Sequence, residues 1–339
     1  MTPAIRIGNQ TAISCRDRMR PFEFALEHGF TAFEWFADKR SNGDGSVSGW
    51  DEADMDAGTR AWIRDTGKAH DVRFTVHAPW QANPLAPEAA ALLRRSVDFA
   101  RDIGAELVNL HLYMEQGATA YVRALAETIR YAAAAGVRLS IENTPHTSPD
   151  DFNRTFARLR QWDAAAAAHV GMCLDLGHAN LCAATRNDYL RYLDALAPEV
   201  PLIHLHVHEN YGDADTHLTL FTGPSRSNDA GVRGFLDRLR QRGYRGALIL
   251  EQWPDPPDLL VAAASRLRGL LGAESANGVA ATAPLARAED DGAFLRALAT
   301  AATEHTSWRG RLQWVRDRFA DPTFRPTVGE LATVAIFLR

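Results

Sequence analysis

The stretch that decides the fold covers residues 137–142 and reads VRLSIE, an apolar, β-branched run that closes on the carboxylate of Glu142. The same kind of run recurs at near-regular intervals along the chain. The others are RFTVH ending at His77, LVNLH ending at His111, VGMCLD ending at Asp175, PLIHLHVH containing His206, and GALILE ending at Glu251. In a parallel barrel the strand ends converge on one mouth, so we expect these side chains to meet there.

Eight short β-rich runs alternate with amphipathic stretches rich in Ala, Leu and Arg. The expected strands are AIRIGN, TAFEWF, RFTVHA, LVNLHL, RLSIEN, VGMCLD, PLIHLHVH and ALILEQ. Several intervening helical stretches end in a glycine (Gly104, Gly136 and Gly243), which is typical of a left-handed helix cap. No GxGxxG follows the first strand, which argues against a dinucleotide fold. The pattern favours an α/β chain folded as a closed (β/α)8 TIM barrel.

The chain is longer than such a barrel requires. Its 339 residues exceed the roughly 250 of a typical (β/α)8 unit. We assign the barrel to residues 1–272, a small, polar, Ala/Gly/Pro-rich linker to 273–289, and a small C-terminal helical extension to 290–339. Three roles for the extension stay open, namely covering the barrel, building a homo-oligomer and binding another partner.

Charge, cysteine content and hydropathy limit the classes of protein to which this chain can belong. The formal net charge is -5 and no cluster of Lys or Arg stands out, so nucleic acid is not the expected partner. Cys15, Cys173 and Cys182 have spacings that suit neither a zinc knuckle nor a disulfide framework, so we expect a reduced, cytoplasmic setting. The N-terminus has no sustained apolar segment, and no run approaches about 18 apolar residues, so neither export nor a membrane span is expected.

Glu142, Asp175, His206 and Glu251 are placed at the ends of the last four expected strands. Any one of them alone could be a helix cap or a buried hydrogen-bond partner. Three carboxylates buried together without a cation would cost several kcal/mol or become protonated. Since His, Asp and Glu are ligands of divalent metals, these four predict a metal site.

A second tier of five residues surrounds these four, namely His77, His111, His178, Asp215 and His217. Together they suffice for two further ions, so we expect between one and three divalent ions, although these residues could instead bind substrate or orient a carboxylate. Four aromatic residues near strand ends, Trp35, Trp80, Tyr113 and Trp253, could stack on a sugar or simply pack at the rim. Glu34 is expected to be a substrate contact or a capped carboxylate.

The segments VHAPW, LVNLHLY, LSIENT, CLDLGHANLC, HLHVHENYGDADTH and LILEQW resemble the xylose isomerase-like TIM barrels over residues 1 to about 272. This superfamily includes sugar isomerases and epimerases, inosose dehydratase and endonuclease IV of AP endonuclease family 2. The resemblance implies that His206 binds metal and that His208 lines the pocket or hydrogen-bonds behind it. It also implies three zinc ions if the chain follows endonuclease IV, or a single Mn, Co, Mg or Zn ion if it follows the isomerases. The chain departs from the family at LTLFTG, which keeps only Gly223 of a usual Gly-x-Gly turn and puts Phe221 where it could close the pocket.

The same ligands allow two chemistries. The expected one is isomerisation or epimerisation of a small sugar-like metabolite through a metal-stabilised enediolate, with Glu142 and Glu251 moving the proton. The alternative is hydrolysis of a small phosphorylated substrate by a multinuclear zinc phosphoesterase in which Glu142 bridges two ions. A barrel without activity that binds a partner through its tail is a third reading, and the intact ligand positions count against it.

Overall fold

The computed structural model describes residues 5–11, 15 and 17–272 of the chain. The predicted linker and helical extension, residues 273–339, lie outside the described residues, so their assignment stays a prediction. No helix within the described ranges is long and apolar enough to cross a bilayer.

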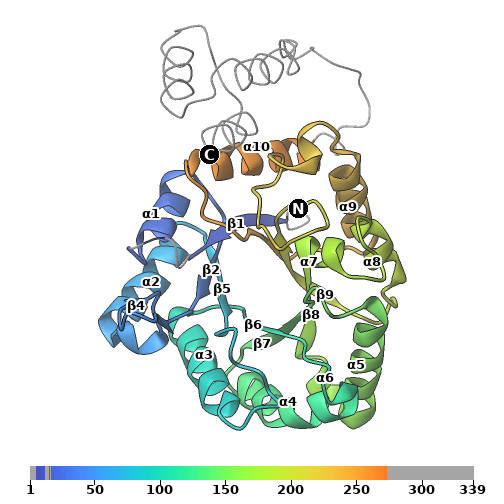
Figure 1. Ribbon diagram of the computed structural model, residues 1–339. Helices are drawn as coiled ribbons and strands as arrows, with labels where there is room; N and C mark the ends of the chain where they lie inside the picture. Colours follow the sequence, from blue (N-terminus) through green and yellow to red (C-terminus); the bar gives the residue numbers. More distant parts are fainter. Residues whose placement is uncertain (1–4, 12–14, 16, 273–339) are drawn as a thin grey trace, which may run out of the picture. The chain divides into compact units, whose positions relative to one another are not determined.

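Eight parallel strands close into a barrel, and every one of the expected strands is present (Figure 1). In barrel order they are β1 (Arg6–Gln10), β2 (Ala32–Phe36), β5 (Arg73–His77), β6 (Leu107–His111), β7 (Arg138–Glu142), β8 (Val170–Asp175), β9 (Leu202–Val207) and β10 (Ala247–Leu250). Strands β1 and β10 pair in parallel and close the ring. The predicted (β/α)8 fold is therefore confirmed.

Helices form a layer outside the strands (Figure 1). They are α1 (Arg20–Glu27), α2 (Ala57–Ala69), α3 (Ala89–Ile103), α4 (Gly117–Ala134), α5 (Pro149–Trp162), α6 (Ala164–Ala167), α7 (Leu176–Leu181), α8 (Tyr189–Ala195), α9 (Ala230–Gln241) and α10 (Asp258–Gly272). The expected cap Gly104 follows α3 with a φ of 73°, a left-handed conformation that favours glycine. A hairpin of β3 (Arg40–Ser41) and β4 (Val47–Ser48) decorates the loop after β2.

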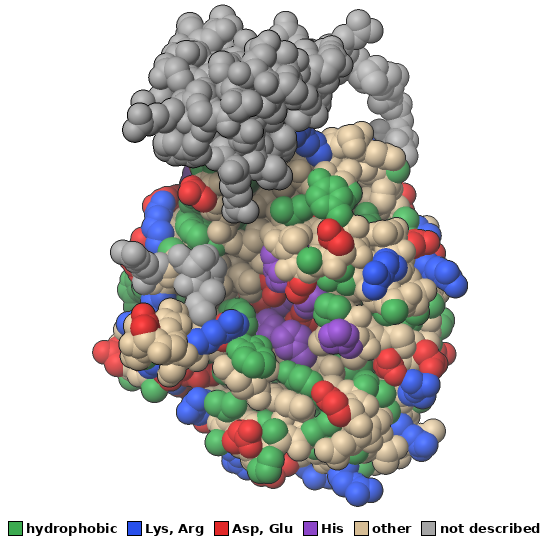
Figure 2. All heavy atoms as spheres, viewed as in Figure 1, with side chains coloured by type: hydrophobic (Ala, Val, Ile, Leu, Met, Phe, Trp, Pro, Cys, Tyr) green, Lys and Arg blue, Asp and Glu red, His purple; other side chains and the backbone are tan. Residues whose placement is uncertain are grey.

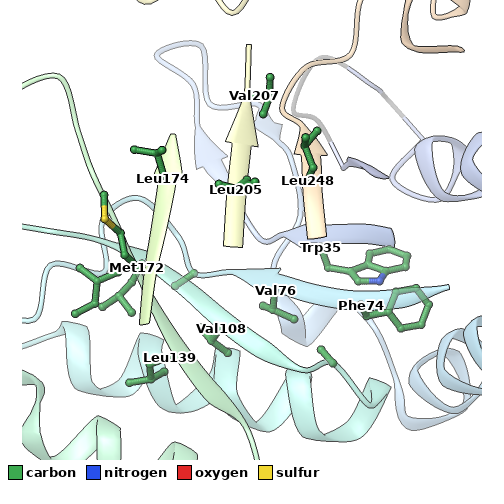
Figure 3. Close-up of a cluster of buried hydrophobic side chains, with 14 of the residues drawn as sticks. Trp35, Phe74, Val76, Val108, Leu139, Met172, Leu174, Leu205, Val207 and Leu248 are labelled. Carbon is green, nitrogen blue, oxygen red and sulfur yellow. The ribbon is translucent and has the colours of Figure 1, made fainter. Parts of the chain in front are cut away.

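The main apolar core lies between the strands and the helices. Strand side chains such as Trp35, Val76, Leu139 and Leu205 point into this layer and are fully or almost fully buried (Figure 3). Because side chains alternate along a strand, the neighbouring positions point into the barrel. Inside the barrel, three of the described apolar residues, Ala32, Ala247 and Ile249, form a small cluster that is separate from the main core. The positions nearer the carboxyl ends of the strands are polar, which places titratable groups inside a rigid scaffold.

Candidate metal centre

Imidazole and carboxylate groups gather in a hollow on the face that Figure 2 shows. Ligand atoms of His77, Glu142, His206 and Glu251 all lie within 4.8 Å of one another, and all four residues are buried. Nδ1 of His206 is 3.3 Å from Glu142 Oε2 and 3.4 Å from Glu251 Oε2. Three of the four residues that the sequence assigned to the principal metal site are thus brought together, with His77 as their neighbour.

Asp175, the fourth of those residues, belongs to adjoining groups. Its ligand atoms lie within 4.8 Å of those of Glu142 and His178, and separately of those of His208 and Glu251. Asp175 also caps α7, because its Oδ1 accepts the backbone N–H of His178 at 2.7 Å. Burial alone would raise the pKa of this carboxyl, but the charges of His178 and His208 lower it well below its usual range.

An outer group consists of His178, His208, Asp215 and His217, whose ligand atoms also lie within 4.8 Å of one another. Asp215 Oδ2 is 3.2 Å from His178 Nε2 and 3.3 Å from His217 Nε2. The rings of His208 and His217 stack with their centroids 3.9 Å apart. The sequence brought three of these residues into one predicted set, and the structure adds His208 to them.

His111 is the most loosely placed of the predicted ligands. Its Nε2 is 3.8 Å from Glu142 Oε1, and the ring makes an aromatic contact with His77. Burial lowers the pKa of His111 to about 4, with the charge of Glu142 opposing the shift. The imidazole is therefore neutral at pH 7 and keeps a lone pair that a metal ion can use.

Glu142 collects the most contacts in the centre. Its side chain is fully buried, Asn109 donates a hydrogen bond to its Oε2, and His77 Nε2 lies 3.2 Å away. Burial by itself raises the pKa of Glu142, but the neighbouring imidazoles, His206 foremost, lower it well below its usual range. Glu142 is consequently an ionised carboxylate, as metal coordination requires.

Backbone carbonyls orient three of the histidines. Nδ1 of His77 lies 2.6 Å from the carbonyl of Ala78, Nδ1 of His178 lies 2.8 Å from that of Asn143, and Nδ1 of His217 lies 3.0 Å from that of Glu251. A carbonyl can only accept, so each Nδ1 carries the proton and each Nε2 is left to face a carboxylate. Metal-binding histidines are typically oriented in this way.

His206 is oriented from the opposite side of its ring. Its Nε2 lies 2.7 Å from Oε1 of Glu34, which leaves Nδ1 facing Glu142 and Glu251. Glu34 is fully buried inside the barrel, where it also accepts from Thr75 at 2.9 Å and contacts Nε2 of His204 at 2.7 Å. Glu34 therefore sits beneath the centre rather than at a substrate surface, and the interpretation of Glu34 as a substrate contact does not fit its position.

The predicted aromatic residues separate into two kinds. Trp35 is fully buried and packs edge-on against Phe33 and Trp50 in the outer core, so it does not reach the mouth. Trp253 lines the cavity described below, and Trp80 is 49% exposed with the guanidinium of Arg40 5.7 Å from its ring centre. The hydroxyl of Tyr113 donates to the carbonyl of Trp80 at 2.6 Å.

Phe221 does not close the cavity as the sequence suggested. Its backbone has a φ of 70°, and the guanidinium of Arg266 lies 4.2 Å from the centre of its ring. Phe221 is not among the described residues that line the cavity.

A cavity of about 520 Å³ opens over the centre. His77, His111, His178, Asp215, His217 and Glu251 line it together with Gln10, Thr11, Phe36, Asp38, Arg40, Gln252, Trp253 and Pro254. Its size suits a small metabolite. His208, which the sequence placed at the pocket, is buried and is not among the described residues that line this cavity; its Nε2 lies 3.1 Å from Asp175 Oδ1.

Sequence reasoning missed the residues that hold the ligands in place. Asn143 joins β7 to β8 through both ends of its side-chain amide, donating to the carbonyl of Asp175 at 2.9 Å and accepting its N–H at 2.8 Å. Asn109 donates to Glu142, and His204 contacts Glu34, each through a single side-chain nitrogen. The available signal was the alternation of strand positions, since Asn109 and His204 each precede a predicted ligand by two residues and share its face.

The arrangement fits a divalent cation. Glu142 Oε1, Glu251 Oε2 and His206 Nδ1 are buried and make no hydrogen bond with any of the described residues. Buried oxygens and ring nitrogens left in this way cost folding free energy unless a cation, or protons in its absence, lies between them. The structure thus defines a closed parallel barrel that carries a set of His, Asp and Glu side chains suited to one or more divalent metals at its carboxyl end.

A family model described as "Xylose isomerase-like TIM barrel" matches residues 22–270, and the chain belongs to this family. Two uncharacterized proteins of Methanocaldococcus jannaschii are similar in sequence. MJ1614 is 26% identical over 182 residues, covering 49% of this chain and 67% of that protein. MJ1311 is 25% identical over 206 residues, covering 56% of this chain and 68% of that protein.

Two solved structures show the same fold. A D-tagatose 3-epimerase-like protein aligns with a TM-score of 0.61 at 19% identity, covering 80% of this chain and 98% of its own. Endonuclease IV from Thermus thermophilus aligns with a TM-score of 0.56 at 22% identity, covering 80% of this chain and 100% of its own. The family model therefore confirms the expected superfamily, and the proteins that share the fold include an epimerase-like protein and an endonuclease.

Proposed function

We propose that this protein is a divalent-metal-dependent enzyme that isomerises or epimerises a small sugar-like metabolite by moving a proton between carbon atoms. The observation that carries the proposal is the different exposure of two carboxylates in one centre. Glu251 lines the cavity, whereas Glu142 is fully buried beneath it and does not line it.

Glu142, Asp175, His206 and Glu251 would hold the principal ion, with Zn, Mn, Co and Mg as candidates. The neighbouring His77, His111, His178, Asp215 and His217 can hold up to two more. The ion, when bound, supplies positive charge beside the substrate's carbonyl and hydroxyl oxygens, where negative charge develops as a proton leaves carbon.

Glu251 is the residue we assign to the proton transfer. Its side chain lines the cavity, so the carboxylate can reach a substrate there while it also contributes to the metal site. Returning that proton to the adjacent carbon on the same face, while the hydroxyl proton of the substrate passes from one oxygen to the neighbouring oxygen, gives an isomerisation with a single carboxylate on carbon. Epimerisation needs a second group on the opposite face, and the contacts of Glu142 with Asn109 and several imidazoles suit a ligand better than a mobile base. The geometry therefore supports isomerisation more strongly.

The outer group favours a second candidate, a multinuclear phosphoesterase acting on a small phosphorylated substrate. Asp215 Oδ2 lies within 3.3 Å of both His178 and His217, as an outer metal site requires. Clustered ions can activate water and clamp the oxygens of a phosphoester. About three tightly held zinc ions per chain, with hydrolysis of bis(4-nitrophenyl) phosphate, would favour this candidate over the first.

Deuterium exchange tests the first candidate directly. The Mn-loaded protein is incubated with a panel of ketoses and aldoses in deuterated water, and deuterium on carbon is measured by mass spectrometry. We expect exchange with the wild type and none with Glu251→Gln, while Glu127→Gln, a change on the exposed face of α4, behaves as the wild type. Full exchange by Glu251→Gln at normal metal content would refute the assignment of the base.

A further inference from the structure

Two glutamine side chains form part of the cavity wall beside Glu251. Gln10 ends β1, and Gln252 directly follows Glu251 after β10. Because Asn9 pairs with Leu250 in the parallel ladder, Gln10 and Gln252 lie at neighbouring strand ends. Both line the cavity, although only 6% of Gln10 and 7% of Gln252 is exposed.

The amides of both glutamines are buried without partners. Gln10 Oε1 and both Nε2 and Oε1 of Gln252 make no hydrogen bond with any described residue. The buried amide of Asn143 differs in this respect, because both of its ends form hydrogen bonds with the backbone of Asp175. A buried amide left unpartnered costs folding free energy, so its retention in a cavity points to a ligand that completes it.

Outside the metal centre, the described residues of this wall carry no excess positive charge. Arg40 is the one Lys or Arg among the described lining residues, and its Nε donates to Asp38 Oδ1 at 3.0 Å. The carboxylate of Asp38, which lines the same cavity, therefore balances the guanidinium. A wall built to hold a phosphate would instead present uncompensated cations or several N–H donors.

We propose that Gln10 and Gln252 form a subsite for neighbouring hydroxyl groups of an uncharged polyhydroxylated substrate, which makes them specificity-determining residues. A hydroxyl both donates and accepts, so it can satisfy the carbonyl and the amino end of an amide at once. A phosphate dianion only accepts and would leave the carbonyl oxygens unpartnered. This inference rests on the proposed function and names its substrate class, a neutral sugar rather than a sugar phosphate.

Alditols test the subsite apart from the chemistry, because they carry hydroxyls but no carbonyl. Unbranched alditols of four to six carbons and their terminal phosphates are titrated calorimetrically into Mn-loaded protein. We expect the neutral series to bind the wild type, and Gln252→Met and Gln10→Met to bind it about tenfold more weakly each, as the loss of one hydrogen bond predicts. The control is Gln241→Met at the exposed end of α9, which should bind as the wild type does.

Stability provides a second readout that a merely structural role would not match. Because each methionine removes an unpartnered amide at similar volume, both variants should have a Tm equal to or higher than that of the wild type, with unchanged metal content. A lowered Tm together with unchanged alditol binding would overturn the proposal. So would binding of the phosphates alone, or of no alditol at all.

The failure of this inference can be told apart from failure of the proposed function. If the two variants weaken alditol binding but the wild type exchanges no deuterium on sugars, the subsite is supported and the isomerase function is refuted. Deuterium exchange that persists while both variants bind alditols like the wild type would do the reverse.

Discussion

Replacing Gly177 by alanine tests how the centre is packed. Gly177 lies in the first turn of α7, directly against the ring of His208. A Cβ at this position would lie 2.0 Å from His208 Cε1 and 2.4 Å from Nε2. Carbon atoms in contact are about 3.5–4.0 Å apart, so the ring has to move by roughly 1.5 Å. That movement takes Nε2 out of reach of Asp175, which it contacts at 3.1 Å.

The magnitude follows from three contributions. Overpacking costs about 1–3 kcal/mol, and losing a hydrogen bond to a charged group costs about 1.5–3 kcal/mol. The better helix propensity of alanine returns up to about 1 kcal/mol. The free energy of unfolding should therefore fall by about 1.5–6 kcal/mol, which lowers the Tm by at least about 3 °C.

Thermal unfolding monitored by circular dichroism measures the effect of Gly177→Ala, and Gly269→Ala supplies the control. Gly269 lies in α10, and a Cβ there meets nothing within 4 Å. Gly269→Ala should leave the Tm unchanged or raise it slightly, because only the helix propensity changes. If both variants melt at the same temperature, the packing argument around His208 is refuted.

Three further predictions concern metal binding. Glu34→Gln should weaken the affinity for Mn or Zn about 10- to 100-fold in a chelator competition. The new amide can donate to His206 Nε2, which moves the ring proton to Nδ1, the nitrogen that faces the metal site. An unchanged affinity would contradict the role of Glu34. Burial lowers the pKa of His217, but hydrogen bonding to Asp215 and the charge of Glu251 raise it to about 10 in the metal-free protein. The protonated His217 therefore contributes its full stabilisation of the metal-free fold below about pH 6.5, and this contribution is lost as the pH rises through 10. Metal binding must displace the same proton, so the affinity for the metal should rise by up to about tenfold for each pH unit. A pH-independent affinity between pH 7 and 9 would count against this protonation state. Removing bound metal with a chelator should lower the free energy of unfolding by about 2.7 kcal/mol relative to protein held at a hundredfold excess of metal over Kd, and an unchanged Tm would show that no ion stabilises the fold.

The fold was predictable because its signal repeats along the chain. Each barrel strand is a short β-rich run, and the polar residue that closes it marks the carboxyl end, as in β7 ending at Glu142 and β8 ending at Asp175. The meeting of Glu142, His206 and Glu251 follows from strand ends converging at the barrel mouth. Which groups share an ion could not be predicted, because Asp175 and His208 take their places through contacts that depend on the β8–β9 register, which shifts between Met172 and Cys173.

The positions of Glu34 and Trp35 on β2 have one physical cause. The strand ends at Phe36, as expected, so Glu34 lies two residues before its end and inside the barrel. Alternation then turns Trp35 outward into the helical layer, where it packs against Trp50. The pattern AFEWF contained this information, since only one of the two residues can face the interior. The role of Gln10 and Gln252 could not be assigned from sequence, because barrel closure predicts that the first and last strands pair but not which side chains beyond their ends turn into the cavity.

The histidines around Glu142 and Asp175 have a consequence for how the protein acquires its ion. Both carboxylates have imidazole neighbours with raised pKa values, namely His77 and His206 for Glu142 and His178 for Asp175. Protons on these imidazoles would offset the buried negative charges in the metal-free protein, so we expect the barrel to fold before it binds an ion. Metal binding would then replace protons in a folded barrel, and one metal could be exchanged for another without unfolding.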